Sequence, residues 1–249
     1  MRSQYLNDPT LIYLCSINMA QSVEIATLPA MTSPLFSIDP AGVSISELGI
    51  LSNGATLEAP IYNGSKIILD LTAGEDDWLE IMEANPTALE HHAGEPTRAM
   101  HIAVHLDVAS VKQLTDIEKQ VQRCKGYSVI NSNKAWKGIH RGNGKIILNV
   151  VLDYSLALTP LRFVHNGILK KGVGEAFLAE CLGESNLTDY QCKVKVELEC
   201  IHETANDISI TLTVHSMILT QMRRRAIVDF TADEEAAAIR AAKRIKYRF

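Results

Sequence analysis

The sequence has no long hydrophobic run. No stretch approaches the roughly 18 apolar residues that a membrane-spanning helix needs. Near the N-terminus Arg2 is the only basic residue, and the apolar segments that follow it, such as residues 11–15, are too short and interrupted for a secretory signal. We therefore expect an intracellular protein without a membrane partner.

The sequence also lacks the cysteine spacing of disulfide-rich or zinc-binding proteins. Its five cysteines are scattered, and none forms a Cys-x-x-Cys pair. Cys192 and Cys200 share a predicted strand but lie too far apart along it to bridge. This pattern favours free thiols in a reducing compartment.

No segment carries a catalytic or cofactor-binding signature. Asp76, Asp77 and Glu80 could supply paired carboxylates, but they begin a predicted helix, where the helix dipole favours acids. Residues 172–174 lack the full G-x-G-x-x-G of a dinucleotide loop, and no serine lies in a G-x-S-x-G turn. The histidines that come in pairs lack neighbours at metal-ligand spacing: His91, His92, His101 and His105. We predict a non-enzymatic protein without cofactor or metal.

The clearest structural signal present lies in residues 192–219. Apolar side chains occupy alternate positions in its two arms: Val194, Val196, Leu198, Cys200, Ile208, Ile210, Leu212 and Val214. Polar residues fill the positions between them, and a polar connector containing Asn206-Asp207 separates the arms. Alternation with a period of two in adjacent segments predicts a β-hairpin with one solvated face.

The rest of the chain predicts a mainly β protein with accessory helices (α+β), either an antiparallel OB-like barrel or a β-sandwich. Asn53-Gly54, Asn63-Gly64 and Asn166-Gly167 predict turns. Further strands are expected at residues 66–71, 98–108 and 146–158. Helices are expected at residues 75–84, 109–124 with Ser110 as N-cap, 175–182 and 231–249. We divide the chain into an arm (1–34), a β-rich core domain (35–222) and a basic C-terminal helix (223–249).

Charge is distributed unevenly although the net charge is only −5. Residues 58–118 are heavily acidic, whereas residues 119–152 contain no acidic residue and carry Trp136 between Lys134 and Lys137. Proteins that bind single-stranded nucleic acid combine cations for the phosphates with aromatic rings for the bases. We predict a nucleic-acid site formed by Arg123, Lys125, Tyr127, Lys134, Trp136, Lys137, His140, Arg141, Lys145, Arg223, Arg224 and Arg225.

The strand pattern resembles that of single-stranded-DNA-binding proteins of large nucleocytoplasmic DNA viruses. The resemblance rests on A-P-I-Y-N-G-S-K-I-I-L-D-L (residues 59–71), the hairpin of residues 192–219, and the helix-like insert V-A-S-V-K-Q-L-T-D-I-E-K-Q-V between them. It implies a viral OB-like barrel that grips single strands in the cytoplasm or nucleus of a host cell. The members related to phage proteins end in an acidic tail with a terminal aromatic, whereas here Phe249 ends a basic tail.

We therefore expect a non-enzymatic protein that binds single-stranded nucleic acid and can form a homo-oligomer. The alternative is a structural, coat-like β-sandwich protein that self-associates through its arm and C-terminal helix. Aromatic content of only 6% favours this alternative. The acidic and basic halves would also suit head-to-tail contacts between subunits.

Overall fold

The computed structural model describes residues 28–222 except 51–55, 75, 90–96, 131, 153–157 and 166. Within these residues, strands form one 13-stranded sheet accompanied by two α-helices. The prediction of a mainly β protein with accessory helices is confirmed. Most of the predicted arm and the whole predicted C-terminal helix lie outside the described residues.

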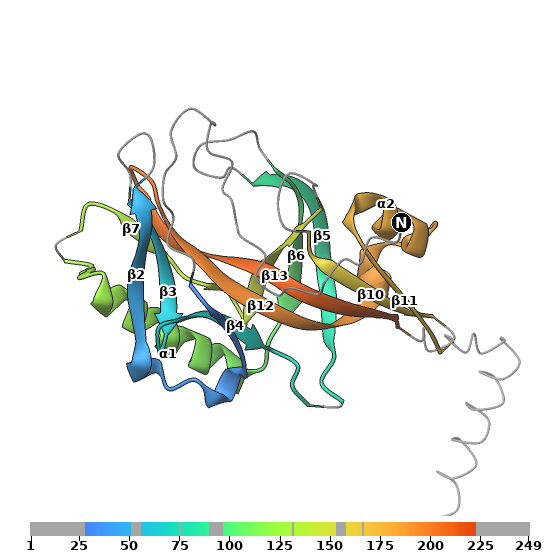
Figure 1. Ribbon diagram of the computed structural model, residues 1–249, viewed down its shortest axis with the longest axis horizontal. Coiled ribbons are helices and arrows are strands. Elements are labelled where there is room, and N and C mark those ends of the chain that lie inside the picture. The colour runs from blue at the N-terminus through green and yellow to red at the C-terminus, as the bar shows by residue number, and fades with distance from the viewer. Residues whose placement is uncertain are drawn as a thin grey trace, which may run out of the picture.

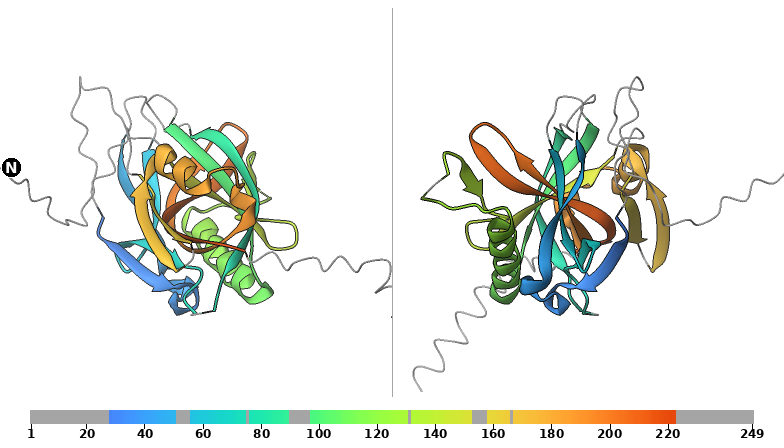
Figure 2. Two further views of the ribbon diagram at one scale, coloured as in Figure 1. Left: turned by 90° about the vertical axis from the view of Figure 1, so that its right-hand side faces the viewer. Right: turned by 60° about the vertical axis from the view of Figure 1, so that its left-hand side comes forward.

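The predicted hairpin is the longest feature of the sheet. Strand β12 (Tyr190–Glu203) has 14 residues, β13 (Asp207–Gln221) has 15, and the two pair antiparallel. Figure 1 shows this hairpin crossing the centre of the molecule, with β2, β3 and α1 at one end and β10, β11 and α2 at the other. The turned views in Figure 2 show the same arrangement from its two ends.

Two bulges interrupt the regular pairing of the hairpin, the first with its extra residue on β13 and the second with its extra residue on β12. The register shifts between Lys195 and Val196 and again between Leu198 and Cys200. Leu198 is fully buried as predicted, but Cys200 is only half-buried and Ile201 takes the next core position. The prediction for Cys200 was wrong because a bulge inserts one extra residue and so reverses which side chains face the core.

The predicted solvated face of the hairpin is in part buried. Glu197 and Thr213, opposite each other in register, are both 2% exposed. The Glu197 carboxylate lies 2.9 Å from the Lys66 ammonium. This buried ion pair explains how a charged side chain occupies the centre of the sheet, since a buried charge needs a partner.

Five ladders form a closed circuit around the main core. From β13, pairing passes to β9 (Lys145–Val151), β6 (Thr97–His105), β5 (Leu79–Leu89), β12 and back to β13. The contact between β13 and β9 is parallel, and the other four are antiparallel. The inward side chains of these strands belong to one continuous hydrophobic core.

A second group of strands extends from the edge of β12 that faces away from β13. It runs through β4 (Ser65–Asp70), β3 (Thr56–Tyr62) and β2 (Val43–Ile50), while β1 (Ala30–Pro34) pairs parallel with β4. The predicted turn at Asn63-Gly64 is confirmed, with φ values of 50° and 75°. The other predicted turn, Asn53-Gly54, lies outside the described residues, but β2 and β3 on either side of it pair antiparallel.

A third group lies along the opposite edge of β13. There β10 (Pro160–His165) runs parallel to β13 and forms a hairpin with β11 (Ile168–Val173), which leads into helix α2 (Gly174–Leu182). The short strand β7 (Ala135–Lys137) pairs with β13, and the short strand β8 (His140–Arg141) pairs with β9. Helix α2 and the hairpin turn therefore agree with the predictions.

Helix α1 (Val108–Cys124) presents Leu114, Ile117 and Val121 to the core, all fully buried, as the apolar stripe predicts. Its N-cap is Asp107 rather than Ser110, because the Asp107 carboxylate accepts a hydrogen bond of 2.7 Å from the Ser110 backbone N–H. This bond lowers the pKa of Asp107. No helix in the described part of the chain is long and apolar enough to cross a membrane.

The predicted helix at residues 75–84 was wrong, because β5 occupies most of this segment. Its acidic residues match a helix start, but Leu79 pairs with Cys192 and Ile81 is buried in the core. Tertiary pairing therefore outweighs the local signal. Pro86 lies inside β5 beyond its contact with β12, where the missing N–H is tolerated on an edge.

The described cysteines are free thiols, as predicted: Cys124, Cys181, Cys192 and Cys200. Burial raises the pKa of the Cys192 thiol to about 12. This thiol therefore stays protonated and unreactive at neutral pH.

The bulge in β12 can be tested by comparing two neighbouring truncations. Ile201→Ala should lower the free energy of unfolding by about 2–4 kcal/mol because it empties a core position. Cys200→Ala should cost less than about 1 kcal/mol because its side chain is only half-buried. Urea denaturation measures both free energies of unfolding. A larger loss for Cys200→Ala than for Ile201→Ala would contradict the bulge and indicate that Cys200 faces the core, as uninterrupted alternation predicts.

Candidate nucleic-acid interface

The predicted basic loop is held against the hairpin by ion pairs. The Lys125 ammonium lies 2.5 Å from Glu58 and 3.1 Å from Glu203, and Lys134 lies 2.6 Å from Glu203. Burial opposes the charge of Lys125, but the bonds to both carboxylates outweigh it and raise its pKa. The bond from Lys134 lowers the pKa of Glu203.

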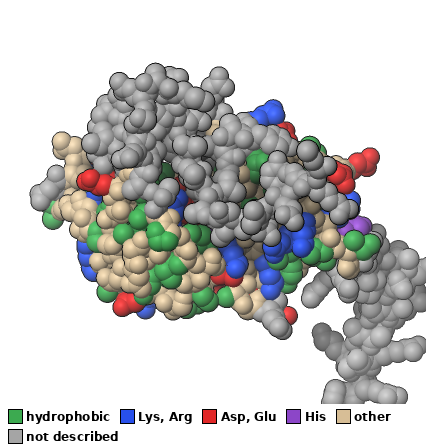
Figure 3. Space-filling view, in the orientation of Figure 1, with side chains coloured by type: hydrophobic (Ala, Val, Ile, Leu, Met, Phe, Trp, Pro, Cys, Tyr) green, Lys and Arg blue, Asp and Glu red, His purple; other side chains and the backbone are tan. Residues whose placement is uncertain are grey.

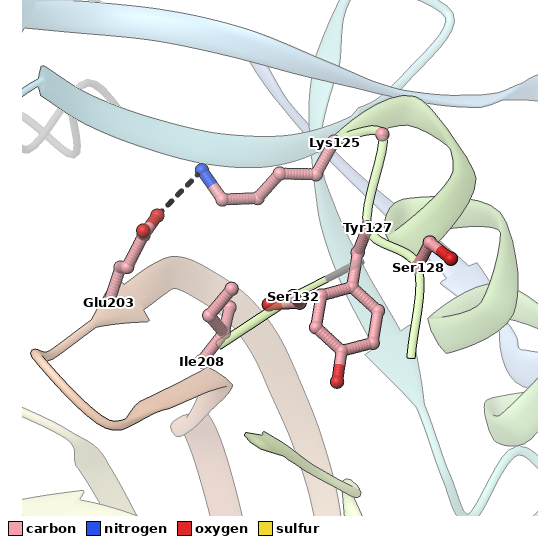
Figure 4. Close-up of a pocket in the computed structure, with 7 residues that line it drawn as sticks. Lys125, Tyr127, Ser128, Ser132, Glu203 and Ile208 are labelled. Carbon is pink, nitrogen blue, oxygen red and sulfur yellow. Dashed lines mark ion pairs between the residues drawn. The ribbon is translucent and has the colours of Figure 1, made fainter. Parts of the chain in front are cut away.

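Lys125 and Glu203 line a cavity of about 300 Å³ at the tip of the hairpin. Figure 4 shows the Lys125–Glu203 pair on one side of it, with the Tyr127 ring and two serines on the other. The cavity is thus bounded by a cation and a carboxylate that already neutralise each other. This balance gives it no preference for anions.

The other lysines of the loop are neutralised in the same way. Lys137 lies 2.6 Å from Asp207 at the start of β13, and Lys145 pairs with Glu83 on β5. All four lysines of the predicted site between residues 123 and 145 therefore have a carboxylate partner. Their net contribution to a phosphate-binding potential is much smaller than the sequence alone indicates.

The two aromatic rings of the predicted site pack together and are half-buried. The ring centroids of Tyr127 and Trp136 are 5.3 Å apart, and the Tyr127 hydroxyl accepts a hydrogen bond from the Trp136 backbone N–H. The Trp136 indole N–H donates to the Glu118 carboxylate at 2.5 Å. Both rings thus help to anchor the loop on helix α1.

Glu118 is a key residue that sequence reasoning missed. It is 5% exposed and also accepts a hydrogen bond of 3.2 Å from the Ile139 backbone N–H. Burial raises the pKa of this carboxyl despite both bonds. The sequence could have predicted its burial, because Glu118 follows Leu114 by four residues and so lies on the same buried stripe of α1.

The remaining residues of the predicted site differ in their surroundings. Arg123 and Arg141 are exposed and form no ion pair with another described residue. The Nδ1 atom of His140 is buried and has no hydrogen-bond partner among the described residues. Arg223, Arg224 and Arg225 lie outside the described residues.

A second basic surface lies on the outward face of the sheet. Lys193 on β12 pairs in register with Ile218 on β13, Ile218 with Arg162 on β10, and Arg162 with Lys171 on β11. Residues paired in register share one face, so this row spans about 15 Å at the usual spacing between strands. We call Lys193, Lys195, Arg162 and Lys171 the sheet-face cluster. Figure 3 shows Lys and Arg side chains gathered over the middle of the long hairpin.

Three members of the sheet-face cluster surround one small pocket. Arg162, Lys193 and Lys195 line a depression of about 100 Å³ together with Ser216. Lys195 lies 3.6 Å from Asp70, which also lines the pocket, whereas Arg162 and Lys171 form no ion pair within the described segments. The pocket therefore has an excess of positive charge.

An aromatic ring lies beside this pocket. The Lys193 ammonium lies 5.2 Å from the centre of the half-buried Trp78 ring and donates a hydrogen bond of 2.7 Å to the Gly74 carbonyl. The geometry thus places a ring next to cations here as well. Sequence reasoning missed this set because its members come from distant segments that only the sheet register brings together.

The sequence matches no protein-family model and no curated protein. The chemistry of the two basic surfaces is therefore the basis for any functional conclusion. The four lysines of the loop site have carboxylate partners, whereas Arg162 and Lys171 on the sheet face form no ion pair with another described residue.

The role of Glu118 predicts a specific pH dependence. Because its folded-state pKa is raised, its contribution to stability is fully present below the ordinary carboxyl pKa and is lost as pH rises through the raised value. Glu118→Gln keeps an acceptor without the charge, so its stability relative to the native protein should increase as the pH rises above the ordinary carboxyl pKa of about 4. Glu118→Ala should cost about 2–3 kcal/mol at neutral pH because it leaves both donors unpaired.

Urea denaturation at several pH values measures these differences. Other carboxyl groups titrate in the same range, so the comparison between Glu118→Gln and the native protein isolates this group. Parallel pH profiles for the two proteins would contradict the raised pKa.

Proposed function

We propose that this protein binds single-stranded nucleic acid, without catalysis, through the sheet-face cluster on the outward face of β12, β13, β10 and β11. The observation that carries the proposal is the row of Lys193, Arg162 and Lys171 in one register across these strands. Such a row offers successive contacts to a phosphate backbone that crosses the strands.

The pocket of about 100 Å³ supports a phosphate position within this track. The Arg162 guanidinium is exposed and its planar donors suit the geometry of phosphate oxygens. Lys193 and Lys195 add positive charge on the other side of the pocket. The Asp70 carboxylate offsets part of this charge, and the balance remains positive.

The neighbouring Trp78 supports a stacking position for a base. Aromatic stacking contributes about 1–3 kcal/mol per base and does not depend strongly on sequence. The closed circuit of five ladders supports an OB-like assignment, a fold in which one outer face and its loops bind oligonucleotides.

The alternative of a self-assembling structural protein rests on the predicted arm and C-terminal helix. Light scattering from the same samples separates the two proposals. A monodisperse protein that binds oligonucleotides supports nucleic-acid binding, and large assemblies without binding support the structural alternative.

Two double variants show whether nucleic acid binds at the sheet-face cluster or at the basic loop. For Arg162→Gln with Lys171→Gln, the slope of log affinity against log salt for a labelled single strand should shrink by about 1.4, since each phosphate contact contributes about 0.7. The matched pair Lys134→Gln with Lys137→Gln should change the slope by much less, because these lysines already have carboxylate partners.

Fluorescence anisotropy over a salt series, with a duplex of the same sequence as control, makes both measurements. The opposite ranking of the two variants would place the interface on the basic loop. No binding by the native protein at low salt would reject nucleic-acid binding altogether.

A further inference from the structure

Strand β11 forms an exposed edge of the sheet. Among the described strands it pairs only with β10. Its apolar side chains are unusually accessible: Ile168 is 67% exposed, Leu169 48% and Val173 40%. Figure 3 shows hydrophobic side chains at the corresponding right-hand margin of the molecule. An exposed apolar edge strand provides a template for pairing with another strand.

The outer edge of β11 offers unused backbone groups. His165 and Ile168 close a two-residue turn, so this pair is hydrogen-bonded between β10 and β11. Because backbone groups alternate in direction along a strand, the N–H and C=O groups of Leu169, Lys171 and Val173 point away from β10. The same three side chains share the outward face of the sheet.

The charge pattern of β11 argues against a second copy as its occupant. If the β11 strands of two copies paired antiparallel about a two-fold axis at the middle of this six-residue strand, either Lys170 or Lys171 would lie opposite the same residue of the other copy. Like charges directly opposite each other destabilise a strand pair. Lys170 is compensated by Glu180 on α2 at 3.1 Å, but Lys171 has no carboxylate partner among the described residues.

We propose that β11 is a docking edge for an extended acidic segment of a partner protein, which adds to the sheet as a further strand. On the outward face, Leu169 and Val173 flank Lys171, so the partner strand carries apolar side chains on either side of an Asp or Glu. Main-chain hydrogen bonds then supply affinity, and the carboxylate opposite Lys171 supplies specificity. This inference does not depend on nucleic-acid binding.

A labelled peptide, Thr-Val-Thr-Glu-Thr-Val-Thr, provides the test because one of its faces carries Val, Glu and Val. We expect fluorescence anisotropy to show binding, with an affinity lower by at least about tenfold for Leu169→Pro, which removes one outward N–H and blocks strand approach. Leu169→Ala is the matched control, since it shortens the side chain but keeps the N–H, and should weaken binding by about fivefold or less.

Two further peptides complete the experiment. Replacing Glu by Lys in the peptide should abolish binding, because the positive charge of the new side chain is repelled by Lys171. Methylating alternate backbone nitrogens keeps the charge but removes hydrogen-bond donors, and it should also abolish binding. This second peptide tests the proposal on the native protein if Leu169→Pro does not fold.

Three results would overturn the proposal. They are no binding of the acidic peptide, equal binding of the Lys and Glu peptides, and binding unaffected both by Leu169→Pro and by backbone methylation. Sedimentation that shows a dimer of the native protein, lost in Leu169→Pro, would assign the edge to a second copy instead.

Discussion

The long β12–β13 hairpin is the constraint on which the rest of the structure depends. One edge of β12 pairs with β5 near its start and with β4 further along, while one edge of β13 pairs in turn with β7, β9 and β10. Each group of strands therefore takes its position from the register of this hairpin. The two bulges of the hairpin, one on each strand, matter because they decide which side chains enter the core and which face outward.

Ion pairing gives a physical account of the uneven charge distribution. Carboxylates from the acidic region, such as Glu58 and Glu83, pair with Lys125 and Lys145 from the basic region that follows it. Glu118 anchors the same loop through the indole of Trp136. The asymmetry that suggests a cationic surface in the sequence thus serves in large part to fix a loop. Among the described residues, Arg162 and Lys171 on the sheet face form no such ion pair, and neither do Arg123 and Arg141 of the loop.

Local signals predicted much of the fold but little of the sheet-face cluster. The alternation of β13, the turn at Asn63-Gly64 and the apolar stripe of α1 each depend on short-range geometry, so the sequence displays them directly. The bulge before Cys200 and the strand that begins at Leu79 depend on pairing with distant partners. Arg162, Lys171 and Lys193 come together only through the register of four strands, and no spacing along the chain reveals that.

The most direct test of the central claim uses the two tryptophans, because Trp78 lies beside the sheet-face cluster and Trp136 lies in the basic loop. Intrinsic fluorescence of Trp136→Phe reports on Trp78 alone, and Trp78→Phe reports on Trp136 alone. We predict that a single-stranded oligonucleotide changes the fluorescence of Trp78 and leaves that of Trp136 nearly constant. A change confined to Trp136 would contradict the claim and place the nucleic acid on the loop.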